Sequence, residues 1–317
     1  MKSMIKAAAT AVAIAASASA ATAADWTPPG PIKLLVAFRS GGGADTHARL
    51  IAEELEARHG WKFIPEEVAG KGGLNMAAAL KDAPADGTVI GLGVTEFFGY
   101  SMAATPKAGM KPADYTPIIT TAGFQMGVVA TSGRGWTTID DAFAAAKAGE
   151  TLSFGVMSPR LADLAYLLGK ANGVDFNIVS LRGGKAVFDA INAGDVDMGF
   201  VAGLQTRAVA AGDMVNLASA ITKPLNQSPD APLLLERGLE FDAEGEFLFV
   251  APAGLPEEAR AAMADAIEAV ITDPNTKAGQ MIAKAFGGAV AIKGDALAER
   301  VQAEFDTSET LLDAASE

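Results

Sequence analysis

The chain has no cysteine among its 317 residues and only two histidines, His47 and His59. Without thiols it has no disulfide bridge, cysteine nucleophile, thiolate metal site or lipid anchor on cysteine. The two histidines stand twelve residues apart, which does not favour a shared metal ion. We therefore expect no metal, no cofactor, and a core that is stable without cross-links.

Motifs for nucleotide binding and hydrolysis are also missing. Neither "GGGADT" nor "GLGVTEFFG" has the G-x-G-x-x-G spacing, and "AGKGG" lacks the residues that a P-loop places around its lysine. No H-E-x-x-H or G-x-S-x-G sequence occurs. Only His47 lies where a general base would be useful, and a histidine on a helix surface is the simpler interpretation. An exported enzyme remains as the alternative function.

Long hydrophobic runs are scarce. The longest, Ala7–Ala16, follows Lys2 and Lys6 and precedes Ala21-Thr22-Ala23, which fits a signal-peptidase site. A membrane anchor is the alternative, but this run is too short to span a bilayer. We predict a signal peptide over residues 1–23, cleavage near Ala23–Ala24, and a periplasmic location.

Basic residues are outnumbered. The chain carries 25 basic and 38 acidic residues, for a net charge of −13. Removal of Lys2 and Lys6 with the signal leaves 23 against 38, or −15. Non-specific nucleic-acid binding is therefore not expected. The net charge does not exclude an anionic small ligand, because a local field can oppose the global charge.

Half of the residues are apolar, and they alternate between strand-like and helix-like runs. The first unit is "IKLLVAF" (residues 32–38), three glycines, and a helix in which Asp45 is the predicted N-cap and Gly60 the stop. Similar strand, loop and helix units follow at "AGKGG", "SPR" and "RGG". This alternation predicts an α/β fold with parallel sheets covered by helices.

Two of these units lie before residue 100 and two after residue 150, which predicts two lobes. Residues 123–135 and 246–254 are the predicted crossing strands. We expect a first lobe of residues 24–126 and 246–317, completed by three C-terminal helices, and a second lobe of residues 127–245. Because ligands lie beyond the carboxyl ends of such strands, all four loops are expected to face one interlobe cleft.

The loops have the composition of an anion site. A glycine-rich turn that opens a helix presents free N–H groups at the positive end of the helix dipole. Cations stand at these loops in Arg39, Lys71, Arg160 and Arg182, and hydroxyl donors in Ser40 and Ser158. Together they match a carboxylate. Each feature also has a structural interpretation: a tight turn, a solvated lysine, an ion-paired arginine, or a helix start at Ser158-Pro159.

Four blocks resemble the receptors of tripartite tricarboxylate transporters, the TctC or Bug family. They are "PIKLLVAFRSGGGADTHARLIAEEL", "EEVAGKGGLNMAAALKDAPADGTVIGLG", "LRGGKAVFDAINAGDVDMGF" and "SPDAPLLLERGLEFDAEGEFLFVAPAGLPEEA". The resemblance implies a two-lobe type II periplasmic-binding fold with a ligand cleft between the lobes. It also implies a monomeric receptor that captures an organic carboxylate and delivers it to membrane permease subunits. A sensor that signals to a membrane kinase is a further alternative.

The resemblance places the carboxylate at the two N-terminal glycine loops, residues 40–43 and 70–73, with second-lobe contacts near Ser158 and Gly183-Gly184. Arg39, Ser40 and Lys71 depart from the family's usual residues, and Val201-Ala202 are less polar than usual, which predicts an anionic ligand with a less polar tail. "TEFFGY" (residues 95–100) forms either an aromatic wall or part of the core. The predicted ligand-binding residues are Arg39, Ser40, Gly41, Gly42, Gly43, Asp45, Lys71, Gly72, Gly73, Thr95, Ser158, Arg160, Arg182, Gly183 and Gly184.

Overall fold

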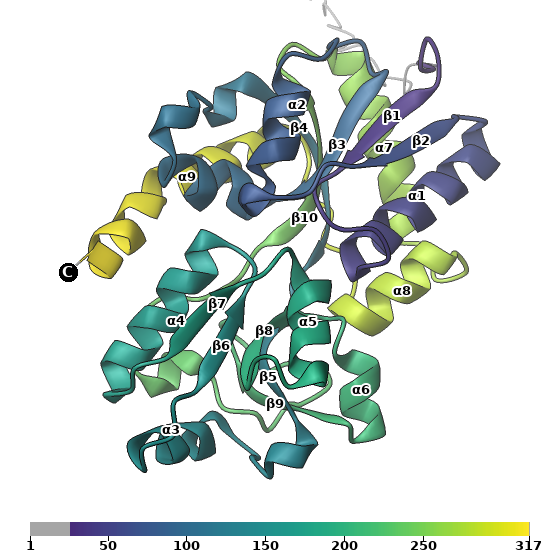
Figure 1. Ribbon diagram of the computed structural model, residues 1–317. Helices are drawn as coiled ribbons and strands as arrows, with labels where there is room; N and C mark the ends of the chain where they lie inside the picture. The colour runs from purple at the N-terminus through teal and green to yellow at the C-terminus, as the bar shows by residue number, and fades with distance from the viewer. Residues whose placement is uncertain (1–25, 317) are drawn as a thin grey trace, which may run out of the picture.

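The computed structural model describes residues 26–316, which form two α/β lobes, each with a five-stranded sheet (Figure 1). The predicted signal peptide, residues 1–23, lies outside the described residues. The first lobe contains β1 (Ile32–Val36), α1 (Gly43–His59), β2 (Phe63–Glu67), α2 (Leu74–Lys81), β3 (Val89–Val94), β4 (Tyr115–Gly123), β10 (Glu246–Pro252), α7 (Glu257–Ile271), α8 (Lys277–Phe286) and α9 (Gly294–Ser316). The second contains β5 (Met126–Thr131), α3 (Ile139–Lys147), β6 (Ser153–Val156), α4 (Pro159–Asn172), β7 (Asn177–Ser180), α5 (Gly184–Ala193), β8 (Met198–Ala202), α6 (Thr206–Ala211) and β9 (Met214–Ser219).

The first sheet has the strand order β2-β1-β3-β10-β4, with β1, β2 and β3 parallel. The chain moves from β1 outward to β2 and then back past β1 to β3. Since such crossovers are right-handed, the reversal places α1 and α2 on opposite faces of the sheet. Helices α7 and α8 pack against α1 (Figure 1). The reversal also leaves a crevice between the carboxyl ends of β1 and β3, where ligands of open sheets bind.

The second sheet repeats this plan with the order β7-β6-β8-β5-β9. Strand β6 leads through α4 outward to β7, and β7 leads through α5 back to β8. The crevice of the second lobe therefore lies between β6 and β8. The predicted two-lobe α/β fold is confirmed, and the loops that follow β1 and β3 line the same pocket as the loops that follow β6 and β8.

The two crossing strands are antiparallel to their neighbours in the sheets, whereas the sequence pattern predicted parallel strands. Strand β10 is antiparallel to β3 and β4, and β5 is antiparallel to β8 and β9. The physical reason is the path of the chain. Each crossing strand enters its lobe from the cleft side, whereas the strands β1, β3, β6 and β8 end there.

Strand β4 was not predicted, and its composition explains why. All of its residues but two are buried, so no alternation of polar and apolar side chains marks it as a strand. It also contains Pro117, which is tolerated because β4 lies at the edge of the sheet. The segment before α9 covers this edge. The hydroxyl of Thr120 donates to the carbonyl of Val290 (2.6 Å) and accepts from the N–H of Ile292 (2.8 Å).

The predicted C-terminal helices join the first lobe. Helices α7 and α9 pack against β4, and α9 also contacts α4 of the second lobe. Over residues 26–316, no helix has both the length and the apolar character needed to cross a bilayer.

Candidate ligand-binding cleft

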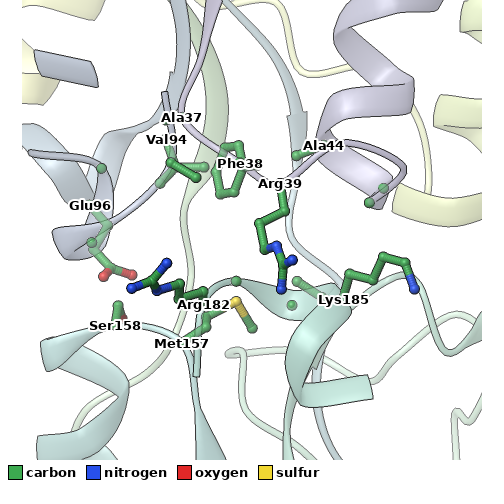
Figure 2. Close-up of a pocket in the computed structure, with 18 of the residues that line it drawn as sticks. Ala37, Phe38, Arg39, Ala44, Val94, Glu96, Met157, Ser158, Arg182 and Lys185 are labelled. Atoms are coloured by element: carbon green, nitrogen blue, oxygen red, sulfur yellow. The ribbon is translucent and has the colours of Figure 1, made fainter. Parts of the chain in front are cut away.

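A pocket of about 160 Å³ opens between the two lobes. One water needs only about 15 Å³ of such space, so the pocket has room for a small organic molecule. Its walls are the loops that follow β1, β2 and β3 in the first lobe and β6, β7 and β8 in the second. Figure 2 shows side chains from both lobes converging on this space.

The first wall is the loop between β1 and α1. Gly41 adopts a positive φ of 77°, and Gly42 forms the N-cap position of α1. Gly43 and Ala44, in the first turn of the helix, line the pocket. The first N–H groups of a helix have no intrahelical partner, and the helix dipole makes this end electropositive. Arg39 adds a full positive charge beside them.

Asp45 requires a correction, because it is neither the N-cap of α1 nor part of the pocket lining. It lies in the first turn, and its carboxylate accepts from the N–H of Gly41 (2.9 Å) and from Nε of Arg49 (2.9 Å). The helix begins at Gly43 with its cap at Gly42, whereas a cap at Asp45 would make Thr46 the first helical residue. Since its charge is already compensated, Asp45 stabilises the turn at Gly41 without facing an anion in the cleft.

The second wall is the loop between β2 and α2, which contains a short 3-10 helix at Lys71–Gly73. All four residues from Gly70 to Gly73 have positive φ values, and Lys71 (φ 51°) is the one described non-glycine residue in this region of backbone space. Such a conformation costs a non-glycine residue roughly 1 kcal/mol or more. Strain of this kind clusters at ligand-binding loops, and Lys71 lines the pocket.

The second lobe contributes the loops that open α4 and α5. Ser158 is the N-cap of α4, as predicted, and accepts from the N–H of Leu161 (3.3 Å). Gly183 (φ 85°) precedes α5, whose first residues Gly184 and Lys185 also line the pocket. Arg182 points into the cleft in Figure 2. Together with α1 and α2, whose N-cap residues Gly42 and Gly73 also line the pocket, four helices present their N-terminal ends to one space.

The lobes touch on either side of the pocket. A Cβ added to Gly72 would lie 3.2 Å from Cδ of Pro159, and one added to Gly42 would lie 3.7 Å from Cβ of Lys185. The hydroxyl of Tyr100 also donates to the carboxylate of Asp163 in the other lobe. The glycines therefore permit the two walls to meet, and the arrangement is that of a closed cleft.

Positive charge dominates the polar lining. Arg39, Lys71 and Arg182 form no ion pair with any acidic side chain of residues 26–316, while Lys185 pairs with Asp189 (2.7 Å). The rest of the wall is largely apolar: Phe38, Val94, Phe97, Phe124, Met126, Met157, Leu161, Leu181, Val201, Ala202, Leu204 and Phe247. Unpaired cations in an apolar pocket favour an anionic ligand with an apolar part.

Ten of the predicted ligand-binding residues line the pocket, and five do not. The five residues outside the lining are Ser40, Gly41, Asp45, Thr95 and Arg160. Ser40 donates its N–H to Glu67 (2.9 Å), which lowers the pKa of Glu67, and Thr95 accepts from the N–H of Glu246 (3.2 Å). Arg160 donates to the carbonyl groups of Asp242 and Glu244, both at 2.8 Å. These contacts hold the walls in place.

The segment "TEFFGY" divides between the wall and the core. Phe97 lines the pocket, whereas Phe98 packs edge-on against Tyr115 in the core. Sequence reasoning did not predict Glu96 or Lys185 as lining residues. A signal for Lys185 was present, because it directly follows the "RGG" loop in the first turn of a helix.

His47 is a core residue and not the helix-surface histidine expected from its position. It is 1 % exposed and lies between Phe247 and Phe286, with ring centroids 5.3 and 5.6 Å away. Its Nε2 is 2.7 Å from the hydroxyl of Thr121, and burial lowers its pKa to about 3. His47 is absent from the pocket lining, so it is not placed to act as a base there. No group of three or more potential metal ligands occurs in the described part of the chain.

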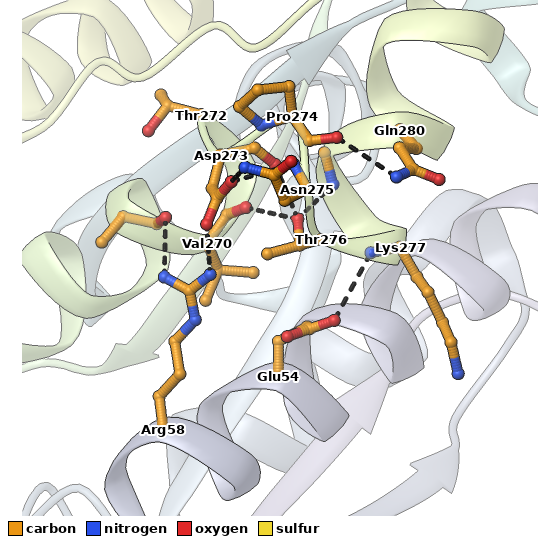
Figure 3. A network of polar contacts seen from close by, with 12 residues as sticks. Glu54, Arg58, Val270, Thr272, Asp273, Pro274, Asn275, Thr276, Lys277 and Gln280 are labelled. Carbon is orange, nitrogen blue, oxygen red and sulfur yellow. Dashed lines mark hydrogen bonds and ion pairs between the residues drawn. The ribbon is translucent and has the colours of Figure 1, made fainter.

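The helix whose first turn lines the cleft is held at its other end by the corner between α7 and α8 (Figure 3). Arg58 of α1 donates to the carboxylate of Asp273 (2.6 Å), and Glu54 accepts from the N–H of Lys277 (3.4 Å). Thr276 caps α8: its hydroxyl accepts from the N–H of Gly279 (2.8 Å) and lies 2.9 Å from the carbonyl oxygen of Val270. This corner therefore fixes the direction of α1.

We expect Thr276→Ala to lower the free energy of unfolding by about 1–2 kcal/mol, because it removes the cap of α8. Thr276 is 3 % exposed, so water does not replace the lost hydroxyl. Urea unfolding measures the change. Thr276→Ser keeps the hydroxyl and is the control. A serine variant as unstable as the alanine variant would show that the methyl group, and not the cap, stabilises this corner.

The fold and the interlobe pocket define a two-lobe solute-binding protein. The chain belongs to the tripartite tricarboxylate transporter receptor family, TctC, whose model matches residues 47–313. Members of this family are receptors and not enzymes. An Agrobacterium vitis protein, described as "UPF0065 protein in the TAR-I ttuE-ttuC' intergenic region", is 28 % identical over 264 residues, covering 80 % of this chain and 75 % of that protein.

Solved structures share the fold. R. palustris Rpa4515, solved with adipate, is 24 % identical to this chain and superimposes with a TM-score of 0.80. The superposition covers 92 % of this chain and 99 % of the Rpa4515 chain. MatC from Rhodopseudomonas palustris, solved with bound malate, is 22 % identical, covers 90 % of this chain and all of its own (100 %), and gives a TM-score of 0.78. At these identities the likeness establishes the architecture.

Proposed function

We propose that this receptor captures an organic carboxylate in its interlobe cleft and delivers it to the membrane permease subunits of a tripartite tricarboxylate transporter. One observation carries the proposal: Arg39, Lys71 and Arg182 surround an apolar pocket without acidic partners among residues 26–316. Adipate and malate in Rpa4515 and MatC support a carboxylate as the ligand class.

The proposed mechanism is closure of the lobes around the ligand. Arg39 and Lys71 belong to the first lobe and Arg182 to the second, so a bridging carboxylate gains contacts in the closed form that the open form lacks. We assign residues 24–126 and 246–317 to the first lobe and 127–245 to the second. Sheet membership supports this division, with Met126 at the start of β5 on its border.

We further propose that the mature receptor is periplasmic, that export follows cleavage of residues 1–23, and that it works as a monomer. Output to a membrane sensor kinase is the second candidate. It would use the same closed form, so the two candidates differ only in the membrane partner. Co-purification of the closed receptor with permease subunits supports transport, and co-purification with a kinase instead overturns it.

The ligand class is tested by calorimetric titration of the mature protein with acetate, succinate, adipate, malate and citrate. Glucose and putrescine serve as an uncharged and a cationic control. The proposal expects saturable binding of at least one carboxylate, with affinity that falls as salt rises from 0.05 to 0.5 M. Binding of glucose or putrescine without any carboxylate would overturn the anion assignment.

Removal of one cleft cation, in Arg39→Ala, Lys71→Ala or Arg182→Ala, is expected to weaken binding of the tightest carboxylate about 10–100-fold. The reason is that a hydrogen bond to a charged group contributes roughly 1.5–3 kcal/mol. Lys147→Ala, at the exposed end of α3, removes the same charge away from the cleft and should leave the affinity unchanged. If Arg39→Ala, Lys71→Ala and Arg182→Ala bind the carboxylate as tightly as Lys147→Ala does, these cations are not ligand contacts.

A further inference from the structure

One acidic side chain stands in this cationic cleft. Glu96 follows β3 and is the only carboxylate among the described lining residues. It is 5 % exposed, and its Oε1 has no hydrogen-bond partner. A buried carboxyl oxygen without a partner has lost the hydrogen bonds that it would make in water, so its presence needs a structural or functional reason.

The surroundings of Glu96 do not supply that reason. Arg160 and Ser158 lie near the carboxyl group, and both favour its ionised form. Arg160, however, directs its N–H groups to the carbonyls of Asp242 and Glu244. Glu304 of α9 is a further acidic neighbour, and burial raises its pKa to about 7, with Glu246 and Glu96 adding to the rise. Burial raises the pKa of Glu96, while Arg160 and Ser158 oppose that rise.

The position of Glu96 indicates what it would contact. Figure 2 shows its carboxyl group directed toward the cleft, next to the guanidinium of Arg182 in this view and on the opposite side from Arg39 and Lys185. A molecule that fills the pocket between these sides presents one end to Arg39 and another part to Glu96 and Arg182. An anionic group there would be repelled by an ionised Glu96, whereas a donor would satisfy the free oxygen.

We propose that Glu96 accepts a hydrogen bond from a donor group on the ligand, and that the receptor therefore selects carboxylates that also carry an ammonium or hydroxyl group. An ammonium group gives the stronger contact, because it pairs with the ionised carboxylate. This inference rests on the proposed function and narrows its ligand class. Plain dicarboxylates of the same length are the disfavoured competitors, since they leave Oε1 unpaired.

Three ligand series of matched length test the inference: succinate, malate and aspartate; glutarate, 2-hydroxyglutarate and glutamate; adipate and 2-aminoadipate. Each is titrated by calorimetry into the wild type, Glu96→Gln and the control Glu53→Gln. Glu53 is exposed on α1, so its substitution removes the same charge outside the cleft. The wild type is expected to bind the hydroxy or amino member of at least one series more than tenfold tighter than the plain dicarboxylate. Glu96→Gln should reduce the amino preference at least tenfold and bind plain dicarboxylates no less tightly.

The outcomes separate the two proposals. If the wild type binds plain dicarboxylates as tightly as every substituted member, or if Glu96→Gln keeps the wild-type preference, the inference is overturned and the proposed function stands. If no carboxylate in any series binds the wild type, both are overturned. The wild-type comparison requires no variant, so the inference is decided even if Glu96→Gln does not fold.

Discussion

Replacing Gly73 with alanine is expected to lower the free energy of unfolding by about 3 kcal/mol and to weaken ligand binding about a hundredfold or more. Gly73 has a φ of 92°, and a Cβ at this position would lie 2.2 Å from Cζ of Phe97. The ring cannot move away easily, because it is 3 % exposed and already lies against Gly93, where an added Cβ would be 2.5 Å from it. Displacement of the ring or of the loop therefore changes the wall of the cleft.

Gly254→Ala separates the loss of stability caused by backbone strain from the loss caused by contact with Phe97. Gly254 has a similar φ of 89°, but an added Cβ there would meet no atom within 4 Å. Its substitution therefore measures backbone strain alone, about 1 kcal/mol. Urea unfolding and calorimetric titration of both variants give the comparison. Equal losses of stability would mean that contact with Phe97 does not matter, and unchanged binding in Gly73→Ala would remove this loop from the ligand site.

A second large effect concerns stability in acid. The hydroxyl of Thr121 donates to the carbonyl of Phe247 (3.3 Å), which leaves it to accept from Nε2–H of His47. Nδ1 has no partner, so a second proton on the ring would be buried without one. Burial accordingly lowers the pKa of His47 to about 3, against about 6.5 in an unfolded chain. Above pH 6.5 neither state is protonated, and the stability from this residue is fully present.

Below pH 6.5 the unfolded chain takes up a proton that the folded chain does not, so stability falls by about 1.4 kcal/mol per pH unit from this residue alone. His47→Gln removes that dependence. Between pH 8 and pH 5 the variant should lose about 2 kcal/mol less free energy of unfolding than the wild type. Urea titrations at both values measure the difference, and the same substitution at the exposed His59 is the matched control. Parallel curves for His47→Gln and the wild type would contradict the assignment.

The repeated unit was predictable from the sequence because strand, glycine loop and helix leave a local pattern four times. The helix stop at Gly60 and the start at Ser158-Pro159 follow from the same local chemistry, and the structure confirms both. The position of the four loops at strand ends, together with the two-group spacing, was enough to predict a two-lobe fold. The family resemblance then added the type of receptor.

Features that depend on distant parts of the chain were not predictable. Whether Arg160 faces the ligand or the crossing segment depends on carbonyl groups more than eighty residues away. Asp45 is a residue type that often caps helices. The helix nevertheless starts before it, because Gly42 adopts the extended backbone of an N-cap and Gly43 is already helical. Glu96 was overlooked because a single carboxylate beside aromatic residues carries no local pattern.

The position of β10 has a consequence for how the protein is made. The strands of the second lobe, β5 to β9, are contiguous in the sequence, so this lobe can fold from local contacts. The first lobe cannot, because β10 lies between β3 and β4 and is synthesised only after the whole second lobe. Until then β3 and β4 expose unpaired edges, which are templates for wrong pairing. The nascent chain is therefore most prone to aggregation between the synthesis of β4 and the arrival of β10, and the ligand site is assembled last.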